Sequence, residues 1–437
     1  MGPRSPRPHR ARLAALLAVL TLAVSACGSG STTTSASTTS PAATAAESGA
    51  AESGAAGSGP ADWDSVLAQA QGQTVNWYMY GGDDTLNAFV TGYLADRLAA
   101  AGVTLDQVPV TDTVDAVNKV LGEVQAGRTT DGSVDLVWVN GENFATGVQA
   151  DLWSCGWDRT LPSAQFVDFS DPAVAADFGT PVNGCEAVWQ QADSALVYDS
   201  AALGAADVAS VSSLFAWARA HPGRFTYPAP PDFTGSMAVR TVLYDSIGGP
   251  QALAGAFDET AYMAATAAFW PRLTDIAGSL WRGGDTYPQS QSAVEKLYSD
   301  GEISAFFTYG PGAVGERVDD GLYPATTRQA VLSGGNIGNR SFVAIPANAA
   351  HQAGAKVLAN LLQDPQTQLE LFTRKGIYPG IDVSRTSPAV QAEFAAVPVH
   401  PSVLPLATLT ADAQPELASE YLARIELDWT RNVLQQQ

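Results

Sequence analysis

The chain has 437 residues, 46% of them hydrophobic, and its 44 acidic residues against 23 lysines and arginines give a formal net charge of −21. Nucleic acids and anionic membrane surfaces are disfavoured as partners, because both reward lysine and arginine. The acidic residues are spread along the chain, which is also what a plain soluble exterior requires. The length exceeds what one hydrophobic core supports and suits two domains.

The first 26 residues carry four arginines and then an uncharged apolar run from Leu13 to Ala26. The run is shorter than the roughly 20 residues needed to span a bilayer, which predicts a signal peptide over residues 1–26. Its end, "LAVSAC", resembles the lipobox of bacterial lipoproteins, and by that resemblance Cys27 becomes the lipidated N-terminus (palmitate-type acyl chains). The protein would then be anchored on the outer face of the cell membrane. The alternative is an ordinary cleaved signal with a leftover cysteine.

Residues 28–61 contain no aromatic residue and no Leu, Ile, Val or Met. Such a segment cannot bury enough apolar surface to fold, so residues 27–61 are predicted to form a lipidated, flexible linker. A Gly/Ser-type coil of this length spans roughly 30 Å end to end and would tether a folded body that begins near Asp62.

Strand and helix patterns alternate along the body. "TVNWYMY" predicts a strand, and after Gly81-Gly82 a helix follows with Asp83 or Asp84 as its cap. "VPVTD" predicts a short strand before a helix that ends at Gly127. "SVDLVWVN" is a nearly continuous apolar run, as expected for a strand buried on both faces of a parallel sheet. The alternation predicts an α/β fold with doubly wound sheets.

The pattern continues beyond Cys185. "EAVWQQADSALVYDS" is a long extended segment that could cross between domains. "RFTYPAP" predicts a strand, "PDFTGS" a loop, and a helix is expected from Met237. "EISAFFTYG" is expected to be a buried strand. Asp364-Pro365 supplies an N-cap with proline at the first helical position, and Gly376 the end of that helix.

Cys155 and Cys185 are the remaining thiols of an exported chain, and the pair is predicted to form a disulfide. Closing a loop of about 30 residues stabilises by roughly 3.5 kcal/mol in the chain-entropy model. Two separate buried thiols are the alternative. The three histidines after residue 26 stand beside proline or in Ala-rich stretches, so no metal site is expected, and no cofactor is expected either. The sequence also has no nucleophile motif or zinc motif that would indicate an enzyme.

The order of these segments resembles the extracellular solute-binding proteins of ABC importers, which have the type II periplasmic-binding fold. The resemblance rests on the lipobox and tether, "ALVYDSAAL", "GEISAFFTYGPG" and "LLQDPQTQLELFTRKGIYP", and covers residues 73–378. "GSVDLVWVNGENFATGVQADLW" is similar to the branch described as thiamine or spermidine/putrescine-type transport components. The family implies no catalytic residue, so the chain is expected not to be an enzyme.

The resemblance implies two lobes joined by two crossing segments, with a small-molecule ligand in the cleft and closure by hinge motion. Lobe one is expected over residues 62–190 plus 333–376, and lobe two over residues 191–332 plus 377–437. The implied partners are an ABC permease and its ATPase. The protein itself is expected to act as a monomer.

In open α/β sheets, ligands bind outside the carboxyl ends of the strands. The residues placed there, or on the crossing strand, are predicted to bind ligand: Tyr80, Gly82, Asp83, Asn140, Glu142, Asn143, Glu186, Trp189, Thr234, Ser236, Tyr287, Tyr309 and Asn336. Several have a structural alternative. Asp83 and Thr234 could only cap helices, and Glu186 and Trp189 could only pack at the hinge.

The predicted ligand residues are aromatic, amide and acidic, with no arginine or lysine among them. An aromatic ring near a carboxylate suits a cation, through a cation–π attraction of about 0.5–2 kcal/mol plus ion pairing. A small organic cation such as thiamine or a polyamine is therefore expected. The same residue types also describe a carbohydrate cleft, and a hydrolase with two carboxylates is the alternative from another class.

Overall fold

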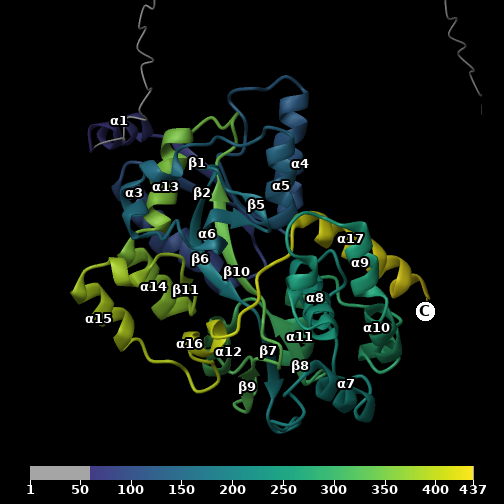
Figure 1. Cartoon of the computed structure of the whole chain (residues 1–437). Helices are drawn as coiled ribbons and strands as arrows, with labels where there is room; N and C mark the ends of the chain where they lie inside the picture. The colour runs from purple at the N-terminus through teal and green to yellow at the C-terminus, as the bar shows by residue number, and fades with distance from the viewer. Residues whose placement is uncertain (1–59, 437) are drawn as a thin grey trace, which may run out of the picture. The chain divides into compact units, whose positions relative to one another are not determined.

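A computed structural model describes residues 60–436 of the chain (Figure 1). The predicted signal peptide, Cys27 and the predicted linker up to residue 59 lie outside these residues. Helix α1 (Pro60–Ala70) begins close to the start expected for the body at Asp62. Within residues 60–436 no helix is long and apolar enough to cross a membrane.

Six strands form the first sheet, in the order β11-β6-β10-β3-β1-β2. They are β1 (Thr74–Tyr80), β2 (Thr104–Val110), β3 (Leu136–Val139), β6 (Glu186–Asp193), β10 (Gly338–Ala344) and β11 (Tyr378–Pro379). β1 pairs in parallel with β2 and β3, whereas β10 is antiparallel to β3 and β6. The sheet is therefore mixed, and the strands predicted at "TVNWYMY" and "SVDLVWVN" are confirmed.

Helices cover both faces of the first sheet (Figure 1). One face packs against α2 (Asp84–Phe89), α3 (Ala95–Ala100), α13 (Gln352–Leu362) and α14 (Pro365–Lys375), with a π-helical turn at Val90–Leu94 between α2 and α3. The other face packs against α4 (Thr113–Gln125) and α5 (Gly141–Gln149). Asp83 accepts hydrogen bonds from the first turn of α2, which confirms the predicted cap.

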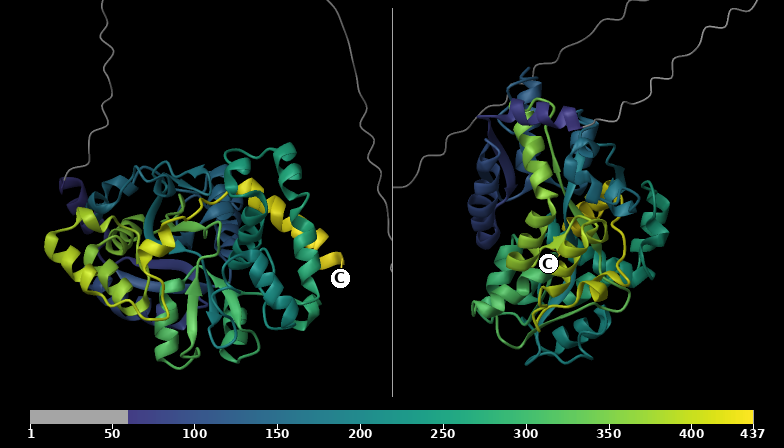
Figure 2. Two further views of the ribbon diagram at one scale, coloured as in Figure 1. Left: turned by 60° about the horizontal axis from the view of Figure 1, so that its bottom comes forward. Right: turned by 90° about the vertical axis from the view of Figure 1, so that its left-hand side faces the viewer.

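The second sheet has three antiparallel strands in the order β8-β7-β9. They are β7 (Ala195–Asp199), β8 (Ala305–Thr308) and β9 (Thr327–Ala330). The largest hydrophobic cluster joins this sheet to helices far apart in sequence, as Figure 2 shows for the C-terminal helix. These helices are α7 (Val211–Ala220), α8 (Phe233–Ile247), α9 (Glu259–Thr266), α10 (Phe269–Ala277) and α17 (Ser419–Asn432). Two further helices, α11 (Gln291–Ser299) and α12 (Val314–Asp319), border β8 and the cavity described in the next subsection.

Two predictions in this half of the chain were wrong. "RFTYPAP" is not a strand; only Phe225 forms an isolated bridge, to Ala305. Its prolines lack the backbone N–H groups that a strand ladder needs. The helix expected from Met237 begins at Phe233, because the Asp232 side chain caps it by accepting a hydrogen bond from the Gly235 N–H at 2.8 Å.

The chain crosses between the sheets twice, as expected. β6 continues through Ser194 into β7, and β9 continues through Asn336 into β10. The crossings are hydrogen-bonded to each other: Ser194 N–H donates to the Ile337 carbonyl at 2.8 Å, and Asn336 Nδ2 donates to the Ser194 carbonyl at 2.8 Å. The segment around Gln414 also packs beside the second crossing, since the Gly338 N–H donates to the Gln414 carbonyl at 2.9 Å.

The lobe boundaries stay a prediction, but the C-terminal part of the chain bears on them. β11 pairs with β6 of the first sheet, and Phe394 in α15 (Pro388–Ala396) stacks on Phe372 of α14. Residues 378–396 therefore lie beside the first sheet, whereas the expectation placed them with the second. From Val403 through α16 (Leu406–Thr410) and α17, the chain packs mainly with the second sheet and its helices.

Cys155 and Cys185 are disulfide-bonded, as predicted. The loop that they close contains α6 (Pro172–Ala175) and the short strands β4 (Ala176–Asp177) and β5 (Thr180–Pro181). It carries Asp177 and Phe178 to the start of α5, where the Gly141 N–H donates to Asp177 Oδ2 at 2.6 Å and the Phe178 ring packs close to Gly141. The disulfide thus fixes a loop that touches the edge of the site described below.

Asp364 is expected to be a stabilising cap. Its Oδ1 accepts from the Gln366 and Thr367 N–H groups, both at 3.1 Å, and pairs with Arg97 at 2.8 Å. Asp364→Ala should lower the free energy of unfolding by about 1–2 kcal/mol, measured by urea denaturation. Asp320→Ala, at an exposed position, is the control; an equal loss in both variants would contradict this role.

Candidate functional site

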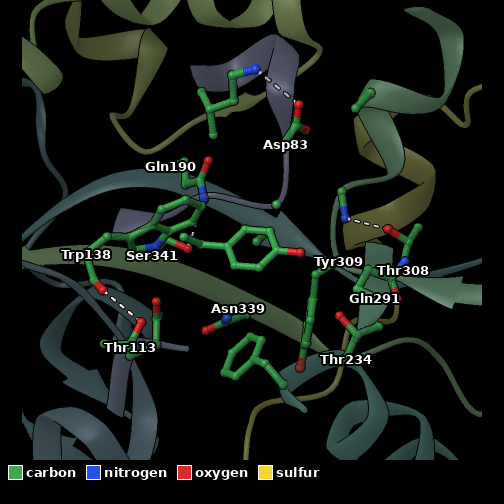
Figure 3. Close-up of a pocket in the computed structure, with 18 of the residues that line it drawn as sticks. Asp83, Thr113, Trp138, Gln190, Thr234, Gln291, Thr308, Tyr309, Asn339 and Ser341 are labelled. Carbon is green, nitrogen blue, oxygen red and sulfur yellow. Dashed lines mark hydrogen bonds between the residues drawn. The ribbon is translucent and has the colours of Figure 1, made fainter. Parts of the chain in front are cut away.

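A cavity of about 430 Å³ lies between residues of the two sheets and their helices (Figure 3). Eight of the thirteen predicted ligand residues line it: Tyr80, Gly82, Asp83, Asn140, Glu142, Asn143, Thr234 and Tyr309. They come from strand ends and helix starts, so the topology brings together residues that are up to 229 positions apart.

The first sheet supplies one wall of the cavity. Trp138 of β3, Gln190 of β6, and Asn339 and Ser341 of β10 face it (Figure 3). Gln190 Nε2 donates to Ser341 Oγ at 3.1 Å. Asn339 is 5% exposed, and its Nδ2 has no hydrogen-bond partner among residues 60–436. An unpartnered donor in a cavity wall is available to a ligand oxygen.

The turn after β1 forms the second part of the lining. The Tyr80 ring folds back over Gly82, where a Cβ atom would meet the Tyr80 hydroxyl, so a larger residue at position 82 would displace the Tyr80 side chain. Burial raises the pKa of Tyr80. Asp83 caps α2 through Oδ1, and its Oδ2 lies 3.5 Å from Arg317 Nη2. Asp83 is therefore both a helix cap and part of the cavity wall.

The second wall comes from α8, α11 and the residues around β8. The rings of Phe233 and Tyr309 pack with their centroids 5.1 Å apart. Asp232 caps α8 and also accepts from the Gln291 N–H at 3.1 Å. Burial raises the pKa of Asp232 to about 6. The wall thus combines an aromatic surface with a carboxyl group whose charge depends on pH near neutrality.

The charges of the lining are unequal. Five carboxyl groups face two cations: Asp83, Asp112, Glu142, Asp232 and Glu295 against Arg317 and Lys375. Both cations are already paired. Arg317 lies 3.1 Å from Glu295, and Lys375 lies 2.7 Å from Glu316. Neither is left over to receive an anion, so the lining favours positive charge.

The start of α5 brings one acidic side chain, Glu142, to the cavity. Asn140 is at the N-cap position but makes no side-chain cap; its Nδ2 donates instead to the Arg340 carbonyl. The side chain of Asp177 caps the start of α5 instead, because its Oδ2 accepts a hydrogen bond from the Gly141 N–H. Glu142 in the first turn lines the cavity, and burial raises its pKa above the ordinary value.

A buried ion pair lies behind the Tyr309 side chain. Arg240 of α8 is 0% exposed, and its Nε and Nη2 each donate to a different Glu416 oxygen at 3.1 Å. Its Nη1 donates to Ser236 Oγ at 2.6 Å, and Tyr309 OH donates to Glu416. The network fixes the hydroxyl end of Tyr309 while the ring remains on the cavity wall.

The other five predicted residues lie outside the lining, and each has a different environment. Trp189 is enclosed by Trp138 and Trp77, with ring centroids at 4.9 and 5.8 Å. Tyr287 packs against Trp429 at 5.0 Å. Ser236 contacts Arg240, Asn336 joins the crossings, and Glu186 is buried beside β10. Their predicted ligand role stays a prediction.

The sequence reasoning missed several lining residues. Gln190 and Gln191 follow Trp189 directly on the strand that was expected to cross between domains. Because alternate side chains on a strand face opposite sides, polar Gln190 beside buried Trp189 was a usable signal. Gln291, Glu295, Arg317 and Lys375 lie within helices, where nothing in the local pattern distinguishes them from solvent-facing residues.

Glu426 of α17 provides a pH test of the buried charges. Burial raises its pKa to about 8, above the ordinary 4.5, so the stability that it contributes is present below pH 4.5 and lost as pH rises through 8. Glu426→Gln, which does not titrate, should match the native protein at pH 4 and exceed its free energy of unfolding by on the order of 2 kcal/mol at pH 8. Denaturant titrations at both pH values measure this, and a difference independent of pH would contradict it.

Among residues 60–436, no group of three or more His, Cys, Asp or Glu side chains is placed to hold a metal ion. The carboxyl groups of the lining sit instead on separate elements around the cavity. What the geometry provides is a polar, aromatic and acidic chamber between two sheets.

Comparisons with known proteins agree with this architecture. The family model of bacterial extracellular solute-binding proteins matches residues 93–398. Protein YnjB of Escherichia coli (strain K12) is 36% identical over 314 residues, 71% of this chain and 79% of that protein.

Solved structures share the fold at low identity. A periplasmic thiamin binding protein matches with a TM-score of 0.55 and 16% identity, over 82% of this chain and 96% of its own. The periplasmic binding protein AfuA from Actinobacillus pleuropneumoniae, with fructose-6-phosphate bound, matches with a TM-score of 0.58 and 10% identity, over 83% and 98%.

The two sheets with a cavity between them define the α/β fold that these solved structures share. The chain belongs to the family of bacterial extracellular solute-binding proteins. Proteins of this family bind solutes outside the bacterial cell.

Proposed function

We propose that this protein captures a small organic cation of the thiamine or polyamine type and delivers it to a membrane permease for uptake. The observation that carries the proposal is the charge of the lining, five carboxyl groups against two cations that are both paired. A cationic ligand would relieve the repulsion among these carboxylates, whereas an anion would add to it.

The aromatic lining supports the same ligand class. Tyr80, Trp138, Phe233 and Tyr309 present rings to the cavity, and a cation over an aromatic face gains about 0.5–2 kcal/mol. One structural neighbour is a periplasmic thiamin binding protein, which is compatible with this class. Its 16% identity is too low to transfer the ligand by itself.

A sugar is the second candidate, and the amide groups of the lining favour it. Gln190, Gln191, Gln291 and Asn339 all face the cavity, and side-chain amides pair well with sugar hydroxyls. The carboxylates would then act as hydrogen-bond acceptors. The unequal charge makes the cation our preferred ligand.

The eight predicted residues that line the cavity are proposed to contact the ligand. The two lobes would close on it by hinge motion at the crossings near Ser194 and Asn336. We also propose that lipidation of Cys27 holds the protein on the outer face of the membrane, as a monomer beside its permease and ATPase.

Isothermal titration calorimetry separates the two candidates. Thiamine, spermidine and a panel of neutral sugars are titrated into the protein, and one of the two cations is expected to bind. Asp83→Asn should weaken that binding, because it removes a carboxylate from the lining. Binding of a sugar alone would overturn the cation proposal and leave the transport class unchanged.

A further inference from the structure

The carboxyl groups that line the cavity differ in how far the protein itself already uses them. Asp232 accepts one hydrogen bond at each oxygen, from the Gly235 and Gln291 N–H groups at 2.8 and 3.1 Å. Glu295 accepts from Gln291 Nε2 at 3.1 Å through one oxygen and pairs with Arg317 at 3.1 Å through the other. Both carboxylates therefore have a protein partner at each oxygen before any ligand arrives.

Two further lining carboxylates cap helices. Asp83 caps α2 through Oδ1, and its Oδ2 lies 3.5 Å from Arg317 Nη2. Asp112 caps α4, because its Oδ1 accepts from the Val114 N–H at 3.0 Å, and its Oδ2 has no partner among the residues that the structure describes. Asp83 is thus fully engaged, and Asp112 is engaged at one oxygen.

Glu142 is the lining carboxyl group that the protein leaves unused. Within residues 60–436 it accepts no hydrogen bond from another residue and forms no ion pair. Arg240 acts on it electrostatically, but Arg240 is already held by both oxygens of Glu416. A carboxylate without a partner in a cavity wall is costly, and a cation that supplies the partner relieves that cost.

A buried amide without a partner lies on the strand that is hydrogen-bonded to the start of α5. Asn140 Nδ2 donates to the Arg340 carbonyl; Glu142 follows Asn140 by two residues, and Asn339 directly precedes Arg340 on β10. Asn339 faces the cavity (Figure 3), is 5% exposed, and has no partner for its Nδ2 in the described part of the chain. We call Glu142 and Asn339, with the hydrogen bond that joins their elements, the α5–β10 corner.

We propose that the α5–β10 corner recognises the ligand at two points: Glu142 pairs with its positive charge, and the Asn339 amide donates to an acceptor atom that the ligand also carries. This inference rests on the proposed function and makes it more specific, because it separates the two kinds of cation named there.

The amide donor is what distinguishes these cations. Aliphatic amines stay protonated at neutral pH, so a polyamine offers N–H donors and no acceptor, and it would leave Asn339 without a partner. Thiamine carries a permanent positive charge together with a hydroxyl oxygen and ring nitrogens that accept hydrogen bonds, and so can satisfy both groups. A site built around a buried polar group rejects a ligand that leaves this group unpaired. The corner therefore favours a cation of the thiamine type over a polyamine.

A matched pair of Glu→Gln variants tests the role of Glu142. Glu142→Gln and Glu295→Gln each remove one negative charge from the same lining, but Glu295 already has protein partners. In calorimetry with thiamine, Glu142→Gln should bind at least about tenfold more weakly than the native protein, and Glu295→Gln no more than about threefold more weakly. Equal losses would mean that the ligand responds to the summed charge of the lining, and would overturn the role of Glu142.

Thermal unfolding of the empty protein provides a second readout for this variant. Because Glu142 has no protein partner to lose, Glu142→Gln should melt at the native temperature or above it. A lower melting temperature would show that Glu142 serves the fold and would contradict its role as a free ligand contact.

Asn339→Leu tests the second contact, since leucine is close to asparagine in size and lacks the amide. The native protein should bind thiamine more tightly than spermidine. The variant should lose about five- to tenfold in thiamine affinity, whereas its spermidine affinity should stay within about twofold of the native value. Asn118→Leu, at an exposed position of α4 outside the cavity lining, is the control and should change neither affinity.

The outcomes separate this inference from the proposed function. Tighter binding of spermidine than of thiamine, or an Asn339→Leu variant that keeps the native ratio of the two affinities, would overturn the inference and leave capture of an organic cation intact. Binding of neutral sugars alone would overturn both.

Discussion

Replacing Arg240 with methionine should cost about 3–5 kcal/mol of unfolding free energy, because it leaves Glu416 buried without its partner. The side chains of this pair are 0% and 6% exposed, so water cannot take over the lost contacts. Denaturant titration at pH 7 measures the loss. It should shrink at lower pH, where Glu416 can be protonated.

The control for this variant is a second ion pair that also includes a residue of α8. Arg272 pairs with Asp245 at 2.7 Å, but its side chain is 26% exposed, and Arg272→Met should cost no more than about 1 kcal/mol. Adding Glu416→Leu to Arg240→Met should restore part of the stability, since it removes the unpaired charge. Equal losses in Arg240→Met and Arg272→Met would contradict the special role of the buried pair.

The double variant Cys155→Ser, Cys185→Ser should lose about 2–5 kcal/mol of stability, because the unfolded chain regains the freedom of a 30-residue loop. Thermal unfolding by circular dichroism measures the shift. A reductant should lower the melting temperature of the native protein toward that of the variant and leave the variant unchanged. A native melting temperature that a reductant does not affect, under conditions where the free thiols appear, would count against this stabilisation.

The sequence predicted the fold wherever a local signal was strong. Asp364-Pro365 and Gly376 bound α14 as expected, because a capping carboxylate, a proline at the first position and a left-handed glycine act within a few residues. "RFTYPAP" failed for the same local reason, since its prolines outweigh its β-prone residues. The pairing of β11 with β6 had no such signal, because it depends on tertiary contacts across the chain.

The site was predictable to the extent that it follows strand ends. Tyr80, Asn140 and Tyr309 were found because parallel and mixed sheets place such ends together. Glu186 and Trp189 were predicted from their place on the crossing strand; both side chains are buried, and their ligand role stays a prediction. The pairing of Arg317 and Lys375 with carboxylates could not be foreseen, because helix-borne residues reach the cavity only through tertiary packing.

The most direct test of the central claim is native mass spectrometry of the gently purified protein, searching for a small molecule that remains bound. We expect a retained organic cation that fits the acidic, aromatic cavity around Tyr80 and Glu142, and its loss from Asp83→Asn. A retained neutral sugar or an anion would contradict the claim that this receptor selects positive charge.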